Sequence, residues 1–408
     1  MTVPPQPYDN RETTFDAYGL HVNAGKVAMY RQLGLDAVMG VRSGSTFDDA
    51  WTDQRFINCH CNGGVFNLGH RHPRIVATLR SALDSLDIGN HHLVSGWRAK
   101  LAERLAGTTG GHLPGVVFGV GGGEAIDLAI KVARAGTSRQ TVVSASGGYH
   151  GHTGLAMAAG DPEFRDPFGP NLPNFSQIPF DDLDALEEAV DSSCAAVLLE
   201  PIPATLGMPI AHPGYFEGVQ AICRERGAML IIDEVQTGLG RTGKMWAYQH
   251  HDLEPDVVVT GKGLSGGLYP ISATLMTREL HSFFDTHPHI HISTFGGAEL
   301  GCAVALEVLD IVEGPGFLTR VSELADCFRE GLDGLPFDLR QRGLMMGLAF
   351  TEEGAGMMAA AALYKAGVFA VWANNDPKVL QFLPPLVLSD AEADDLIARL
   401  RGVLERLS

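Results

Sequence analysis

The sequence predicts an α/β fold with a mainly parallel central sheet covered by helices on both faces. Short apolar, β-branched segments alternate with amphipathic helical segments between about 116 and 262, which is typical of such sheets. Two of these segments, 228–233 and 256–261, are continuously apolar, as expected for strands buried on both faces. The 408 residues, 45% of them hydrophobic, can bury a large core and favour two or more domains.

The predicted elements follow in chain order. Residues 1–50 predict helical and loop-like segments, and a hairpin-like strand region with a glycine-containing connection follows. An amphipathic helix is predicted from about 73 to 86, where the apolar residues recur at helical spacing. Further strands are predicted at 116–120, 141–146, 195–200, 228–233 and 256–261, with helices at 124–135 and 214–227.

From about 298 the sequence becomes mainly helical. Two helical segments are joined by the breaker Gly-Pro-Gly at 314–316. A strand region is predicted at 339–350, and an amphipathic helix closes the chain. We see no internal repeat and no low-complexity linker.

Composition limits the possible partners and location. The net charge of −18, from 30 Lys and Arg against 48 Asp and Glu, argues against a nucleic-acid or anionic-membrane partner. No leader-like pattern begins the chain and no apolar stretch reaches the length of a membrane span. We therefore expect a soluble, cytoplasmic protein.

The six cysteines are scattered and show no disulfide-framework spacing. The only closely spaced cysteines are in Cys59-His60-Cys61. Because no second pair accompanies this Cys-x-Cys, a role in packing is favoured over a role as zinc ligands. The alternating His287, His289 and His291 would share one face of a strand, but no carboxylate or cysteine nearby completes a metal set. We expect no metal.

Asp233 and Lys262 stand at the ends of two successive predicted strands. In an open α/β sheet the ligand crevice lies beyond the carboxyl ends of the strands, so both should face it. One interpretation is an ion pair that holds two loops. The other is a pyridoxal phosphate (PLP) site, in which the lysine forms a Schiff base and the aspartate keeps the pyridine nitrogen protonated. Of the seven lysines, only Lys262 follows a wholly apolar strand and precedes a run of glycines.

Two motifs resemble one family specifically. Asp-Glu-Val-Gln-Thr-Gly-Leu-Gly-Arg-Thr-Gly at 233–243 and Gly-Lys-Gly at 261–263 resemble the signature of the class III (ornithine/ω-amino acid type) aminotransferases, and the resemblance extends from 67 to 386. It implies a fold type I PLP enzyme that acts as a homodimer with shared active sites. It also implies an N-terminal segment (1–60) joining the small domain, a large PLP-binding domain (61–297) and a C-terminal small domain (298–408).

The stretch 238–244 also matches the glycine–lysine spacing of a P-loop. Met245 stands where that loop needs Ser or Thr for magnesium, which argues against a nucleotide-hydrolysing enzyme.

The resemblance implies several cofactor-binding residues. After the first large-domain strand, the backbone N–H groups of Gly122 and Gly123 would bind the PLP phosphate, although glycine replaces the family's serines there. Tyr149 would stack on the pyridine ring. The remaining expected cofactor residues are His150, Glu200, Gln236 and, reaching across the dimer, Thr294.

Three positions bear on the substrate. The turn containing Gly63 would lie at the substrate mouth, or is a structural turn with positive φ. In dual-substrate members of the family, a glutamate after Glu-Pro pairs with an arginine before Pro-Pro-Leu, and that arginine can bind a substrate carboxylate. Thr205 and Gln381 stand at these two positions here. The absence of both the glutamate and the arginine predicts atypical recognition of the substrate carboxylate.

The resemblance therefore implies an aminotransferase. It would move an amino group between an amine or amino acid and a keto acid or aldehyde, through a Schiff base on Lys262 with Asp233 as the second catalytic residue. The alternative is a PLP enzyme of another reaction type, such as a decarboxylase, epimerase, aminomutase or lyase. A non-catalytic binding protein is the third hypothesis.

Overall fold

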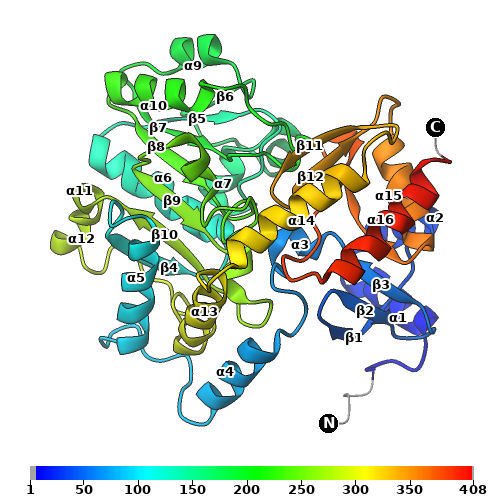
Figure 1. Ribbon diagram of the computed structural model, residues 1–408. Helices are drawn as coiled ribbons and strands as arrows, with labels where there is room; N and C mark the ends of the chain where they lie inside the picture. The colour runs from blue at the N-terminus through cyan, green and yellow to red at the C-terminus, as the bar shows by residue number, and fades with distance from the viewer. Residues whose placement is uncertain (1–5, 407–408) are drawn as a thin grey trace.

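The computed structural model describes residues 6–406 and contains one seven-stranded sheet and two four-stranded sheets. In Figure 1 the large sheet, with its helices, lies apart from a smaller region in which the N-terminal (blue) and C-terminal (orange and red) parts of the chain meet. The pairing of β3 (Arg55–Asn58) with β13 (Val368–Phe369) joins these two parts directly.

The large sheet has the strand order β4-β10-β9-β8-β7-β5-β6. The neighbours from β9 to β6 pair in parallel, as the sequence predicts, but β10 is antiparallel to both β4 and β9. The strands are β4 (Gly115–Gly119), β5 (Thr141–Ala145), β6 (Phe175–Ile178), β7 (Cys194–Leu199), β8 (Met229–Asp233), β9 (Val257–Thr260) and β10 (Ser272–Met276).

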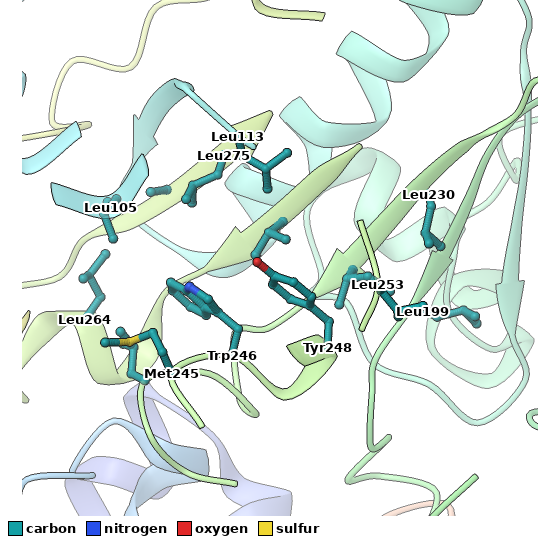
Figure 2. Packing of buried hydrophobic residues seen from close by; sticks show 14 of the residues in the cluster. Leu105, Leu113, Leu199, Leu230, Met245, Trp246, Tyr248, Leu253, Leu264 and Leu275 are labelled. Atoms are coloured by element: carbon teal, nitrogen blue, oxygen red, sulfur yellow. The ribbon is translucent and has the colours of Figure 1, made fainter. Parts of the chain in front are cut away.

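Helices cover both faces of this sheet, because alternate residues of the strands point to opposite sides. Ile231 and Val257 pack in the cluster under α6 (Gly122–Thr137). Leu230 and Val258 pack in the cluster that includes α5 (Gly96–Thr108), α10 (Tyr215–Arg226) and α13 (Glu299–Val312). Figure 2 shows part of this second cluster, with Trp246 and Tyr248 among leucines from the strands and helices. The continuous apolar runs are thus buried on both sides, as predicted.

Shorter helices complete the large region. They are α4 (Pro73–Leu83), α7 (Gly154–Ala158), α8 (Pro162–Arg165), η1 (Asp166–Phe168), α9 (Leu183–Ala189), η2 (Ala247–His251), η3 (Lys262–Ser265), α11 (Arg278–His281) and α12 (Phe283–Thr286).

The N-terminal part contains more strand than expected. After α1 (Arg11–His21) and α2 (Ala24–Leu33), the chain forms β1 (Met39–Ser43) and β2 (Thr46–Asp49), which pair antiparallel before β3. The expectation of only helical and loop-like segments up to residue 50 was wrong. Most of β1 is exposed, so the segment lacks the apolar alternation by which a strand is recognised. A short segment, α3 (Cys61–Gly64), then leads to the large region.

The C-terminal part forms the third sheet, of order β11-β12-β15-β14, with helices packed on it. Its core also includes Ile57 and Cys59 from the N-terminal part. The elements are α14 (Phe317–Gly331), β11 (Asp338–Arg342), β12 (Met345–Ala349), α15 (Ala355–Lys365), β14 (Val371–Ala373), β15 (Asp376–Phe382) and α16 (Asp390–Leu404).

The packing of α13 suggests a different domain boundary from the expected one at 297. Its buried residues, among them Val304 and Val308, belong to the core of the large sheet, whereas Val321 of α14 belongs to the small core. The breaker at 314–316 lies between the two helices. We therefore propose that the large domain extends to about residue 313.

The histidine-rich segment 287–297 contains no strand, so its alternating histidines do not share a strand face. Within residues 6–406, no three His, Cys, Asp or Glu side chains are grouped so that they could hold a metal ion. In the same range, no helix combines the length and apolar character needed to cross a membrane.

Candidate active site

Polar side chains gather at one edge of the large sheet, where the parallel strands end. Glu200 follows β7, Asp233 is the last residue of β8, and Lys262 comes shortly after β9. Parallel strands bring their carboxyl ends to the same edge, which is where ligands bind in open α/β sheets. A cavity of about 140 Å³ lies there, lined by Gly122, Gly123, Tyr149, His150, Gly151, Glu200, Asp233, Val235, Gln236 and Lys262.

Asp233 is held in a fixed orientation inside this cavity. Its Oδ1 accepts a hydrogen bond from the backbone N–H of Val235 at 3.0 Å, and its Oδ2 lies 2.9 Å from Nδ1 of His150. Burial on its own lowers the pKa of His150, but the hydrogen bond and charge of Asp233 outweigh it, so the pKa is raised. His150 therefore donates from Nδ1 to Oδ2 of Asp233.

Lys262 presents a poorly solvated amine. Its φ of +39° is left-handed, which is uncommon for a residue with a side chain and marks backbone strain at functional sites. Nζ donates to Oε1 of Gln236 at 2.6 Å. Burial lowers the pKa of Lys262, and the charges of Asp233 and Glu200 offset this only in part. In the described part of the chain Lys262 makes no ion pair, so the interpretation as a loop-holding ion pair was wrong.

Glu200 and Tyr149 form the third side of the cavity. Oε2 of Glu200 accepts a hydrogen bond from the backbone N–H of Tyr149 at 2.9 Å. Burial raises the pKa of Glu200 to about 7, with the charge of His150 acting in the opposite direction. Tyr149 is 42% exposed, and its ring centroid lies 5.2 Å from that of His152. The side chain therefore lines the cavity while part of the residue stays accessible.

Glycines keep the cavity open. A Cβ on Gly63, whose φ is +64°, would lie 3.1 Å from Nζ of Lys262. A Cβ on Gly122 would lie 3.1 Å from Val235, and one on Gly123 would lie 2.9 Å from Thr153. Such distances are tighter than normal packing. The positive φ at Gly63 favours glycine there, and a side chain at Gly122 or Gly123 would require Val235 or Thr153 to shift.

A second cavity of about 480 Å³ shares Tyr149, Gln236 and Lys262 with the first. The three expected substrate positions, Gly63, Thr205 and Gln381, all line it. Oγ1 of Thr205 donates to the carbonyl of Gly147 at 2.8 Å. Nε2 of Gln381 donates to the carbonyl of Ala204 at 3.1 Å, so the two positions are adjacent in space.

Thr294 is the one expected cofactor residue that is separate from the rest. It is exposed and lines neither cavity. Its expected role across a dimer stays a prediction.

Sequence reasoning missed several lining residues. Gly151 and Val235 lie within recognised motifs and could have been found from their positions beside Tyr149 and Asp233. Phe164, Phe369 and Trp372 of the larger cavity come from distant segments without a local motif, so no sequence signal pointed to them.

The P-loop alternative also fails on geometry. Arg241, in the middle of 238–244, is completely buried, and its guanidinium donates to the carbonyls of Leu344 and Pro384 and to Oδ1 of Asn67. The following segment, 247–251, is a short 3-10 helix. The stretch therefore connects the large and small regions, and it is not followed by an α-helix whose N-terminus could bind a phosphate.

These features define a fold type I transferase with an acid and a lysine at the sheet edge. The sequence profile described as Aminotransferase class-III matches residues 41–404. A relative described as an uncharacterised aminotransferase of Archaeoglobus fulgidus is 51% identical over 396 residues, covering 96% of this chain and 93% of that protein. The chain belongs to the class III aminotransferase family.

Solved structures agree in fold over the whole chain. The ornithine aminotransferase of Toxoplasma gondii ME49 superimposes with a TM-score of 0.85 at 28% identity, covering 98% of this chain and 99% of that one. A second structure of the Toxoplasma enzyme, with a TM-score of 0.84, 28% identity and the same coverage, has partial occupancy of PLP at its active site. The family and the relative favour transamination over decarboxylase, epimerase, aminomutase or lyase chemistry.

Proposed function

We propose that this aminotransferase uses PLP, held in the 140 Å³ cavity and attached through Lys262. The single observation that best supports this is the arrangement of Lys262, Asp233 and the glycines around one space. The N-terminus of α6 at Gly122 can receive a phosphate, Tyr149 offers a ring face, and Asp233 supplies a fixed carboxylate. When bound, PLP would supply an aldehyde for an amine and a ring that withdraws electrons.

Each residue then has a separate task. Asp233, oriented by His150 at 2.9 Å, holds a proton on the ring nitrogen. Lys262, whose pKa is lowered by burial, can accept a proton from the substrate carbon and return it. Gln236, bonded to Nζ at 2.6 Å, orients this amine without fixing a charge on it.

We further propose a homodimer. Exposed apolar side chains occur on two segments that adjoin each other, since the ring centroids of His92 and His289 are 6.2 Å apart. The exposed residues are Leu93, Val94, Trp97, Ile290, Ile292 and Phe295. An apolar surface of this kind favours a protein partner, and Thr294, exposed on the same segment, would then reach a partner's cofactor.

The substrates proposed are an amine or amino acid as donor and a keto acid or aldehyde as acceptor. Thr205 and Gln381 carry no charge, which supports atypical recognition of any substrate carboxylate. A cytoplasmic location is also proposed, and cell fractionation would test it.

The test of the proposed function is reduction with borohydride followed by peptide mapping. PLP should be fixed to the peptide that contains Lys262, and Lys262→Ala should lose both this label and turnover. Label on another lysine would disprove the assignment. Accumulation of pyridoxamine phosphate from an amine donor alone would separate transamination from other PLP chemistry.

A further inference from the structure

The larger cavity beside Lys262 has walls that are mainly apolar and aromatic. Its side chains come from separate parts of the chain: Tyr30 and Leu35 near the N-terminus, Phe164 from α8, and Phe369 and Trp372 near the C-terminus. At about 480 Å³ the cavity has the size typical of small-molecule sites. It opens directly onto the amine of Lys262, so any substrate placed for reaction must put the rest of its structure here.

We infer that the substrate accepted by this cavity is a primary amine with an uncharged, largely apolar tail, and that Trp372 is its main specificity-determining residue. This inference rests on the proposed function, since it assumes that the amino group reacts beside Lys262.

Charge is the first argument. Among the described residues, Lys262 is the only Lys, Arg, Asp or Glu side chain that lines the cavity, which also contains the histidines His60 and His152. Burial and the nearby Lys262 lower the pKa of His60 to about 4, so it is neutral near pH 7. A carboxylate that entered would lose hydration, and no arginine among the described residues of this chain lines the cavity to bind it in bidentate fashion, which is unfavourable.

Two arginines that could bind a carboxylate have other partners. Nη1 of Arg340 donates to the carbonyl of Gly207 at 2.7 Å and lies 3.7 Å from Asp376. Arg241 is buried among carbonyl oxygens. Neither arginine lines the cavity.

Hydrogen-bond donors are the second argument. Thr205 Oγ1 donates to the carbonyl of Gly147, and Gln381 Nε2 donates to that of Ala204. Nδ2 of Asn375 is also occupied, by the carbonyl of Gly147 and by Asp161, both at 3.0 Å. The hydroxyl of Thr205, both N–H groups of the Asn375 amide and one N–H group of Gln381 therefore bond to the protein and not to a ligand. The amide oxygen of Gln381 accepts hydrogen bonds, and an ionised carboxylate has no hydrogen to donate to it.

Trp372 is well placed to select the tail. It lies on β14, paired with Leu380 of β15, and it packs against both the small-domain core and the N-terminal cluster. A partly buried indole held on a paired strand gives a large, rigid apolar surface. The net charge of −18 acts in the same direction, because it disfavours the approach of dianionic substrates.

The test is calorimetric binding to the holoenzyme of two ligands of the same shape, 3-phenylpropanamide and 3-phenylpropanoate. The neutral amide should bind at least about 10-fold more tightly than the carboxylate. Trp372→Ala should weaken binding of the amide by about 10-fold. The control is Phe168→Ala, which truncates a 72% exposed aromatic residue outside the cavity and should leave the Kd of the amide unchanged. If Trp372→Ala does not fold, Trp372→Leu replaces it. The ratio of the two ligands' Kd values in the wild-type protein tests the preference for an uncharged tail by itself.

A parallel measurement compares the half-reaction of 3-phenylpropylamine with that of 4-aminobutanoate. Faster reaction of the aromatic amine supports the inference, whereas preference for the amino acid overturns it and leaves the proposed function intact. If the holoenzyme accumulates pyridoxamine phosphate with no donor from a wider set of amines and amino acids, the proposed function fails, and the ratio of ligand Kd values still decides the nature of the cavity. Equal or tighter binding of the carboxylate ligand overturns the inference in every case.

Discussion

Nζ of Lys262 donates a hydrogen bond to Oε1 of Gln236 at 2.6 Å. The amine at the base of the site is therefore held by a neutral amide, while the nearest carboxylates, Asp233 and Glu200, act on it only through their charge. A carboxylate in contact with the amine would stabilise its protonated form. The amide orients Lys262 and leaves its lowered pKa in place, which a residue that must accept protons requires.

A first prediction follows for Gln236→Glu. An anion at hydrogen-bond distance should raise the pKa of Lys262, because it stabilises the protonated amine. The measurement is the pH dependence of Lys262 modification by an amine-reactive reagent in PLP-free protein, followed by mass spectrometry. The midpoint should move to higher pH in the variant, because only the neutral amine reacts.

The exposed Lys26 provides the internal control, since it lies outside both cavities. Its modification profile should be the same in both proteins. An unchanged midpoint at Lys262 would mean that the contact with residue 236 does not govern the state of the amine.

Asp233→Asn is the second prediction. The amide keeps the size of the side chain but removes the negative charge that His150 orients at 2.9 Å. PLP should still bind, while proton abstraction from an amine donor should slow by at least about 100-fold. Single-turnover absorbance measurements, with the PLP content determined separately, test this. Normal turnover by a variant with full PLP content would refute the role given to Asp233.

Thr294 leads to a third prediction, because it is exposed and lines neither cavity of its own chain. If it acts across a dimer, mixing inactive Lys262→Ala subunits with impaired Thr294→Ala subunits should restore activity. Each mixed dimer would contain one site with both residues intact. Mass spectrometry should first show that the subunits exchange. Exchange without recovery would argue against shared sites.

Local motifs carried most of the information about the site. Asp233 and Lys262 end strands whose continuous apolar character is visible in the sequence, and Gly122 and Gly123 start a helix directly after a strand. Parallel strands must bring such residues to one edge, and the same cavity indeed contains Tyr149, His150, Glu200 and Gln236. The family resemblance supplied their identity, and the sheet geometry explains why they meet.

Other features depend on contacts between distant segments. The bond from Gln381 to Ala204 and the position of Trp372 on the substrate cavity arise from packing between the two parts of the chain. The antiparallel insertion of β10 depends on its pairing with both β4 and β9. Neither hydrophobic periodicity nor turn chemistry encodes such pairing, so these features could be seen only in the structure.

Glu234 gives a fourth prediction, which concerns stability. Burial raises its pKa from 4.5 to about 7, and hydrogen bonds from Thr237 and Tyr248 offset this only in part. Between these two pH values the folded protein binds a proton that the unfolded chain has lost. The contribution of Glu234 to the free energy of unfolding should therefore fall as pH rises, by up to about 3 kcal/mol.

Glu234→Gln should remove this dependence, because its amide can accept from the backbone N–H of Tyr248 and donate to Thr237. Denaturant unfolding at about pH 5 and about pH 8 tests it. The variant should gain stability relative to wild type at the higher pH. An equal difference at both pH values would mean that Glu234 is not protonated in the folded state.

The last prediction concerns the two positions where the family pairs a glutamate with an arginine. Gln381 bonds to the carbonyl of Ala204, next to Thr205, so these positions are neighbours here as well. Gln381→Arg alone places an unpaired charge at a site that is only 6% exposed, and should destabilise the protein by about 3–5 kcal/mol. Adding Thr205→Glu supplies the partner and should recover most of this loss.

The double variant should also acquire affinity for carboxylates, because the new guanidinium can bind them in bidentate fashion. Binding of 3-phenylpropanoate should tighten by at least about 10-fold relative to wild type, while that of 3-phenylpropanamide should not. Thermal unfolding and calorimetry on the wild type, both single variants and the double variant provide the full cycle. Additive stability changes would show that residues 205 and 381 do not interact, and the neutral pair would then not explain the character of the cavity.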